Sequence, residues 1–208
     1  MKKFTTLVMS MTAVFALTAC GKGTKVSEEE FNKKAAAVEE HQYTEATIKY
    51  SFEEEMSMPD FTDPSKTVSD NDKDSGEIKL VNNNGKWTVK DGKDNEEYTS
   101  LVGLTLKDAN FDAKDMSASY EQMAKQYGIE AKVSYYSNPL GVEVSAKGNY
   151  DQDGAKGKVD IYVYTAFDKY GYITKVEEKV NISGTATYGN NTYSSKMVVK
   201  MSATISYK

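Results

Sequence analysis

The second half of the chain alternates between apolar and polar residues with a period of two, and this pattern constrains the fold more than any other feature. The alternation is cleanest in residues 193–208, where one face holds Tyr193, Met197, Val199, Met201, Ala203, Ile205 and Tyr207 and the other holds Ser194, Lys196, Lys200, Ser202, Thr204, Ser206 and Lys208. Successive side chains of a strand point to opposite faces of its sheet. The pattern therefore predicts a strand with one buried and one solvated face.

Similar alternation runs through most of the chain after Ile129. Asn, Asp, Gly and Pro, the residues typical of tight turns, interrupt it at residues 138–139, 151–154, 168–171 and 189–191. Between the last two turns, Val176, Val180 and Ile182 share a face opposed by Lys175, Glu177, Lys179 and Asn181. We therefore expect a meander of four or five antiparallel strands.

One segment of this meander is apolar on both faces. In residues 159–166, one face carries Val159, Ile161 and Val163, and the other carries Tyr162, Tyr164 and Ala166. A strand that is covered on both sides is central in its sheet, or its second face meets helices or a ligand.

The first half of the chain begins with a helix signal and continues with strands. Ser27 and Glu30 have the spacing of a capping box, which predicts a helix that ends near His41. Residues 46–56 alternate as a strand, and residues 57–75 are expected to form an exposed loop because they hold two prolines and repeated Asp. Shorter strands are expected at residues 76–81 and 86–90, joined by the turn at residues 82–85.

The middle of the chain is expected to be more helical. Residues 96–106 are ambiguous, since their apolar spacing fits a short helix while Thr and Gly103 weaken it. Residues 112–127 are clearer, because Met116, Tyr120, Met123 and Tyr127 fall on one helical face ahead of Gly128. This face packs on the sheet as core, or it lines an apolar groove.

The order of these elements predicts an α+β fold in which a curved antiparallel sheet packs against an N-terminal helix and mid-chain helices. Residues 27–208 are expected to form a single domain. A hydrophobic content of 39% is enough to build a core, and fifteen tyrosines favour a sheet.

The N-terminus indicates where the protein works. Lys2 and Lys3 precede an apolar stretch at residues 4–17, and Leu-Thr-Ala-Cys-Gly follows at residues 17–21. This arrangement has the charged and apolar regions of a secretory signal and resembles a bacterial lipobox. The resemblance implies a signal peptide at residues 1–19, a diacylglyceryl group on Cys20 and a lipidated tether at residues 20–26. The apolar stretch is too short for a transmembrane helix.

The expected order of helix, long strand, mid-chain helices and meander resembles the LolA/LppX-type half-barrel lipoproteins. In that family, a curved antiparallel sheet is closed by helices over an apolar cavity that carries acyl chains. If the sheet of this chain encloses a ligand, the apolar second face of residues 159–166 and the helical stripe of residues 112–127 are expected to line the cavity together. Its walls would then include Tyr162, Tyr164, Tyr120 and Met123, which are flat or deformable apolar side chains.

A second candidate site lies in the Asp-rich segment at residues 69–77. Asp70, Asp72 and Asp74 have the spacing of the first ligands of a calcium loop. The rest departs from an EF-hand, because Ser75 occupies the sixth position and Val81 the twelfth. Weak calcium binding and a solvated acidic loop are both open readings, and no other cofactor is expected.

The sequence offers little for catalysis or nucleic-acid binding. His41 is the only histidine, and phosphate-binding, nucleophile-elbow and zinc-protease motifs are absent. The net charge is −5, without a basic cluster, so nucleic acid is a poor partner. All 26 basic residues are lysines, so the chain has no bidentate guanidinium for phosphate or carboxylate groups.

These observations favour a non-catalytic lipoprotein, held by its lipid on the cell membrane or, if the host has one, the outer membrane, and facing outside the cytoplasm. We expect a monomer that binds an apolar or amphipathic, lipid-like ligand. The alternative is a surface lipoprotein that recognises another protein through its sheet.

Overall fold

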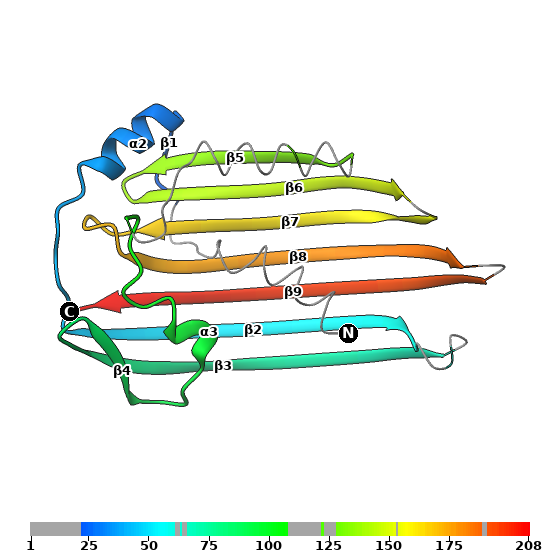
Figure 1. Cartoon of the computed structure of the whole chain (residues 1–208), viewed down its shortest axis with the longest axis horizontal. Coiled ribbons are helices and arrows are strands. Elements are labelled where there is room, and N and C mark those ends of the chain that lie inside the picture. The colour runs from blue at the N-terminus through cyan, green and yellow to red at the C-terminus, as the bar shows by residue number, and fades with distance from the viewer. Residues whose placement is uncertain are drawn as a thin grey trace.

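The computed structural model describes residues 22–60, 63, 66–107, 122, 128–152, 154–188 and 191–208. They form one open antiparallel sheet of nine strands in the order β1-β5-β6-β7-β8-β9-β2-β3-β4 (Figure 1). The strands are β1 (Thr24–Val26), β2 (Glu45–Pro59), β3 (Thr67–Asn83), β4 (Lys86–Asp91), β5 (Glu130–Ser137), β6 (Leu140–Gln152), β7 (Ala155–Phe167), β8 (Ile173–Tyr188) and β9 (Asn191–Tyr207). Two short helices, α2 (Glu28–Ala36) and α3 (Glu96–Thr99), complete the described elements.

The predicted meander is confirmed. Strands β5 to β9 are consecutive neighbours, and β9 has the predicted phase, with Met201, Ala203 and Ile205 buried and Lys200 exposed. The α+β assignment fits only loosely, because the described part of the chain is mostly strand. The helix predicted at residues 112–127 lies outside the described residues, apart from Gln122.

Strand β9 joins the meander to the N-terminal strands. It pairs with β8 on one side and with β2 on the other, so that Ile205 lies opposite Ile48 and Ala203 lies opposite both Tyr50 and Val176. The paired residues share a face, which carries the apolar rows from strand to strand across the sheet.

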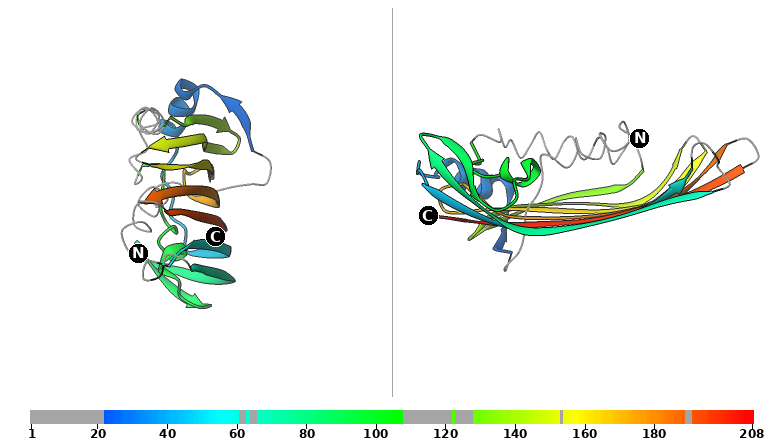
Figure 2. Two further views of the ribbon diagram at one scale, coloured as in Figure 1. Left: turned by 90° about the vertical axis from the view of Figure 1, so that its right-hand side faces the viewer. Right: turned by 90° about the horizontal axis from the view of Figure 1, so that it is seen from below.

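The sheet is curved along its length, and α2 and α3 lie on its concave side at one end (Figure 2). The main core lies there: Phe31 of α2 and Tyr98 of α3 pack with Ile48, Val142 and Val176 from the sheet. Ser27 caps α2 as predicted, because its Oγ accepts a hydrogen bond from the Glu30 backbone amide at 3.2 Å.

Tyrosine rings lie across glycines on this concave face. The ring of Tyr150 covers Gly157 and Gly184, where an added Cβ would come within 2.5 and 2.3 Å of its hydroxyl oxygen. Tyr50 covers Gly76 in the same way, and its other side stacks on Tyr98 with centroids 4.3 Å apart. The glycines make room for flat rings, and this packing holds α3 over the sheet.

Three sequence predictions are wrong or too long. Residues 57–75 are not a loop, because β2 continues to Pro59 and β3 begins at Thr67. The N-terminal helix ends at Ala36, five residues before His41. Of residues 96–106, only Glu96–Thr99 is helical.

The sheet phase can be tested on neighbouring residues of β2. Ile48 is fully buried, whereas the Lys49 side chain is 73% exposed and forms a surface ion pair with Glu77. We expect Ile48→Ala to lower the free energy of unfolding by about 2–5 kcal/mol through loss of packing. Lys49→Ala should cost less than about 1 kcal/mol. Urea denaturation of both variants measures this, and equal losses would contradict the phase.

Candidate functional site

The two predicted ligand residues in the described region, Tyr162 and Tyr164, lie on the convex face of the sheet. They pair with residues whose side chains point away from the main core, and with Tyr136 and Ala166 they form a second, smaller apolar cluster. Tyr120 and Met123, their predicted partners, lie outside the described residues, as does Cys20.

Lys22 covers this convex cluster. Its ammonium lies 5.0 Å from the ring centroid of Tyr162 and 5.9 Å from that of Tyr164, and it forms an ion pair with Glu143. Burial alone lowers the pKa of Lys22, but hydrogen bonds to Glu143 and Tyr162 raise it overall. Glu143 also accepts a hydrogen bond from the Tyr136 hydroxyl at 3.0 Å. The convex tyrosines therefore lie under a paired charge and do not form an open wall.

Asp70, Asp72 and Asp74, the predicted calcium ligands, lie on one face of strand β3. They stand opposite Met56, Glu54 and Phe52 of β2. A calcium loop folds its ligands around the ion, whereas an extended strand spreads alternate residues about 7 Å apart. Within the described part of the chain, no three His, Cys, Asp or Glu side chains come together as a metal site.

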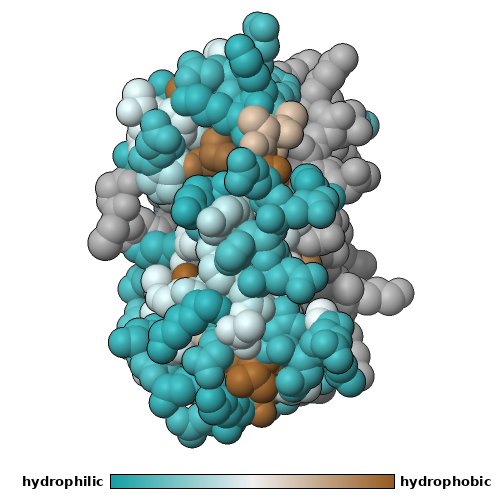
Figure 3. All heavy atoms as spheres, turned by 90° about the vertical axis from the view of Figure 1, so that its left-hand side faces the viewer, coloured by the Kyte–Doolittle hydropathy of each residue, from teal (hydrophilic) through white to brown (hydrophobic). Residues whose placement is uncertain are grey.

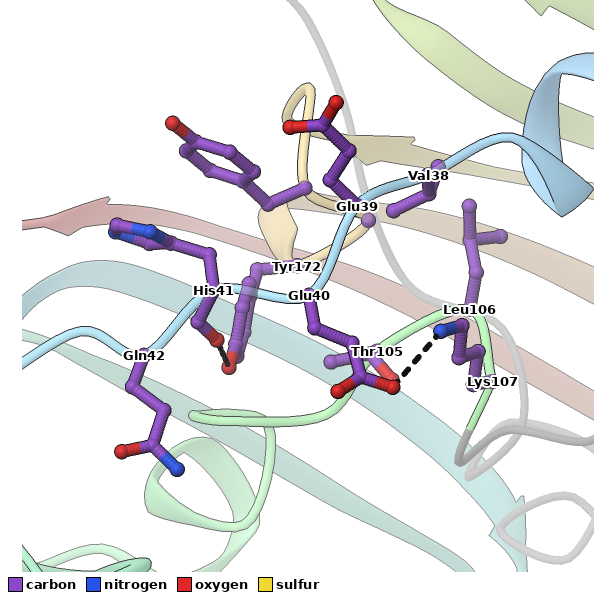
Figure 4. A pocket seen from close by; sticks show the side chains of 11 residues that line it. Val38, Glu39, Glu40, His41, Gln42, Thr105, Leu106, Lys107 and Tyr172 are labelled. Carbon is purple, nitrogen blue, oxygen red and sulfur yellow. Dashed lines mark hydrogen bonds and ion pairs between the residues drawn. The ribbon is translucent and has the colours of Figure 1, made fainter.

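His41 lines a hollow of about 380 Å³ at the end of the sheet, between residues 38–42, 105–107 and 170–172 (Figure 4). Its ring stacks on Tyr170 with centroids 4.1 Å apart, and its backbone carbonyl accepts a hydrogen bond from the Tyr172 hydroxyl at 2.6 Å. Glu40, next to His41 on the same segment, forms an ion pair with Lys107 across the hollow at 3.3 Å. The hollow is open to solvent, and both polar and apolar side chains line it.

Tyr43 connects this hollow to the sheet. Its ring contacts those of His41 and Tyr207, and its hydroxyl donates a hydrogen bond to Asp168 at 2.7 Å. Burial and this carboxylate raise the pKa of Tyr43. Asp168 also accepts hydrogen bonds from the backbone amides of Tyr170 and Tyr172. The Asp168 carboxylate thus stabilises the turn at residues 168–172. The His41 imidazole packs against aromatic rings.

A second hollow, of about 550 Å³, lies beside Trp87 and is lined by residues of β4 and α3. The end of the molecule that carries α2 is mostly hydrophilic, with small separate hydrophobic spots (Figure 3). Among the described residues, Val68 and Leu104 are the large exposed hydrophobic ones; Val68 lies on β3 and Leu104 in the segment after α3. These features do not combine into a broad apolar patch on the face shown.

The concave face holds a polar group that the sequence analysis missed. Glu178 lies within β8, opposite Val163 of β7 and Met201 of β9. It is only 3% exposed. The period of two could have found it, because position 178 falls in the apolar series of Val176 and Val180. A charged residue in such an apolar row indicates a buried charge, which is rare in proteins unless the charge is paired.

Glu178 lies near other polar groups at the edge of α3. Burial, and then the Glu97 carboxylate, raise the pKa of Glu178 to about 7. Burial also raises the pKa of Tyr98, with further contributions from Glu97, Tyr50, Asp74 and Glu178. The Tyr98 hydroxyl is buried without a hydrogen-bond partner. The Tyr98 hydroxyl therefore lies in the field of the other four groups. We call these five residues the concave polar cluster: Glu178, Glu97, Asp74, Tyr98 and Tyr50.

Comparison with protein-family models found no match, and comparisons with curated proteins and with solved structures found none either. Within the part of the chain that the structure describes, no helix is both long and apolar enough to cross a membrane. The site must therefore be interpreted from its own geometry.

The buried position of Glu178 predicts a pH dependence of stability. Its carboxyl holds a proton more tightly in the folded than in the unfolded chain, so stability falls as the pH rises from about 4.5 to about 7. The loss amounts to roughly 3 kcal/mol. Glu178→Gln should remove this loss of stability with pH. The difference in unfolding free energy between the variant and the parent should therefore shift in favour of the variant between pH 5 and pH 8.

Glu177→Gln is the matched control. Glu177 is the preceding residue on the opposite face and forms a surface contact with Lys179 at 3.7 Å. Its replacement should change stability by less than about 1 kcal/mol at both pH values. Denaturant titrations measure both variants, and an unchanged pH profile for Glu178→Gln would show that this carboxyl titrates as in water.

Proposed function

We propose that this protein is a non-catalytic, lipid-anchored lipoprotein that faces outside the cytoplasm and binds an amphipathic, lipid-like ligand on the concave face of its sheet. The observation that supports this most is the length of the apolar surface on that face. Apolar rows continue well beyond α2 and α3, where the described side chains are half-buried: Met56, Val159, Ile161, Ile182, Met197 and Val199.

The shape of the sheet is consistent with this proposal. An open, curved sheet with an apolar concave face has the half-barrel form of the LolA/LppX-type lipoproteins, in which acyl chains lie against such a face. A ligand with a flexible tail would cover apolar side chains that α2 and α3 leave uncovered. The burial of each methylene of such a tail contributes about 0.8 kcal/mol.

The concave polar cluster offers a binding position for the polar end of the ligand. Glu178 is buried on this face, and the buried Tyr98 hydroxyl has no hydrogen-bond partner among the described residues. A buried polar group without a partner lowers stability, so a ligand that supplies the missing partner gains affinity from it. An amphipathic ligand fits both the apolar rows and the concave polar cluster.

The alternative function, recognition of another protein through the sheet, is favoured by the open edge of β3. Strand β4 pairs only with the part of β3 from Lys79 to Asn83, so the preceding residues have a free edge among the described strands. That edge carries Asp70, Asp72 and Lys73, however, and charged edges discourage strand addition. We therefore rank ligand binding first.

Anchoring depends on Cys20 in this proposal. Replacing Cys20 with Ser should release the mature protein from the membrane fraction, because a lipid on this residue is the proposed anchor. Cell fractionation and immunoblotting measure the distribution. The lipoprotein assignment fails if Cys20→Ser remains membrane-bound after washing with salt and carbonate.

Ligand binding can be tested with two neighbouring residues of β9. Met197 lies on the concave face and Val198 on the convex face, and both are half-buried. We expect the full chain with Cys20→Ser to bind the neutral solvatochromic dye Nile red saturably. Adding Met197→Gln should weaken binding roughly tenfold, which corresponds to about 1.4 kcal/mol.

Val198→Gln should leave the affinity for the dye unchanged. Circular dichroism and urea denaturation must show that both variants keep the parent fold. Binding that is absent, or equally weakened by both replacements, argues against a ligand on the concave face and leaves the surface-recognition alternative.

A further inference from the structure

The charges of the sheet are distributed unequally between its two faces. On the convex side of β2, Glu53 contacts both Lys73 and Lys200 at 3.0 Å, and Glu55 contacts Lys196 at 2.6 Å. Lysines thus pair with the convex carboxylates from the neighbouring strands. This pairing compensates the charge on that face.

The concave carboxylates have no such partners within the described part of the chain. Glu178, Glu97 and Asp74 form no ion pair with a described lysine, although Asp74 accepts a hydrogen bond from the Tyr50 hydroxyl at 3.3 Å. Glu54, farther along the same face, also lacks a described cation. Burial, then Asp70 and Asp72, raise its pKa. Negative charge therefore accumulates on the concave face, and no lysine in the described part of the chain forms an ion pair with it.

Glu178 is the most deeply buried of these carboxylates. It is 3% exposed, and the same face of β8 carries Val176 and Val180, which are 0% and 2% exposed. The Tyr98 hydroxyl, whose pKa Glu178 helps to raise, is a buried oxygen without a hydrogen-bond partner among the described residues. A carboxylate in such surroundings is destabilising unless a cation or hydrogen-bond donor joins it.

We propose that the ligand of the concave face carries a protonated amine, which Glu178 binds as the counter-ion. An ammonium group donates up to three hydrogen bonds, and the carboxylate of Glu178 and the hydroxyl of Tyr98 are available as acceptors. Glu97 and Asp74 add a favourable potential for a cation. Fatty acids and other anionic amphiphiles would be repelled by the same groups, and no arginine compensates for this.

This inference rests on the proposed function, since it assigns the head group of the same ligand. The test uses three probes with the same ten-carbon tail: decylamine, decanol and decanoate. Each is titrated at pH 8, below its micellar concentration, into the full chain carrying Cys20→Ser. Decylamine should bind at least tenfold more tightly than decanol, and decanoate should bind most weakly.

Two variants separate Glu178 from the overall acidity of the protein. Glu178→Gln should reduce the affinity for decylamine at least tenfold and leave that for decanol within about twofold. Glu177→Gln removes the same charge from the other face and should change neither affinity. Stability measurements at pH 8 confirm that both variants are folded before the titrations are compared.

The outcomes distinguish the two proposals. Binding of decanol with no preference for decylamine, or a preference that survives Glu178→Gln, overturns the amine assignment and leaves the apolar ligand site intact. If none of the three probes binds, the proposed function and the amine assignment both fail.

Discussion

The pairing of β9 with β2 is the interaction on which the rest of the structure depends. Without it, the meander of β5 to β9 and the N-terminal strands β2 to β4 would be two separate sheets, each with an exposed apolar face. The register places Ile205 opposite Ile48, and both are buried. The contact joins residues about as far apart in sequence as the domain allows, which makes it costly in chain entropy and slow to form.

The two faces of the sheet differ in polarity and in how their charges are paired. The convex face is solvated through most of its length, and cross-strand ion pairs such as Lys147 with Asp160 organise its charges. The concave face is apolar, and it keeps a few carboxylates that no described lysine compensates. Stability alone would favour a hydrophobic residue at position 178, because replacing a buried charge by an apolar group is often stabilising. A binding role gives a physical reason for the carboxylate.

Much of the sheet could be predicted from the sequence, and the errors have identifiable causes. The phase of β9 followed from its regular alternation, since one face meets the core and the other meets water. Residues 67–75, the first part of β3, are predicted as loop from the sequence, because repeated Asp and the nearby prolines are typical of exposed loops. An edge strand tolerates these residues, since one of its sides has few pairing partners. Helix α2 ends at Ala36, and in the segment that follows it His41 stacks on Tyr170. This contact joins residues far apart in the sequence, so no local pattern predicts it.

The candidate site was harder to predict than the fold. Sequence alone shows that residues 159–166 are apolar on both faces, but not which face is concave, so Tyr162 and Tyr164 were assigned to a cavity while they lie under Lys22 on the convex side. Glu178 was left out of an apolar series because a charge interrupts the pattern there. Its importance depends on its burial, which the alternation within its own strand does not reveal.

If Cys20 carries the proposed lipid, the docking of Lys22 constrains how the domain sits on the membrane. With a lipid on Cys20, only Gly21 separates the anchored residue from Lys22, whose side chain is fixed to Glu143, and two residue steps of extended chain span about 7 Å. Thr24–Val26 then continues as β1 along the edge of β5. The domain would therefore have little freedom to pivot. The end of the sheet that carries the β5–β6 turn would lie close to the bilayer, and the far end of the concave face would project away from it.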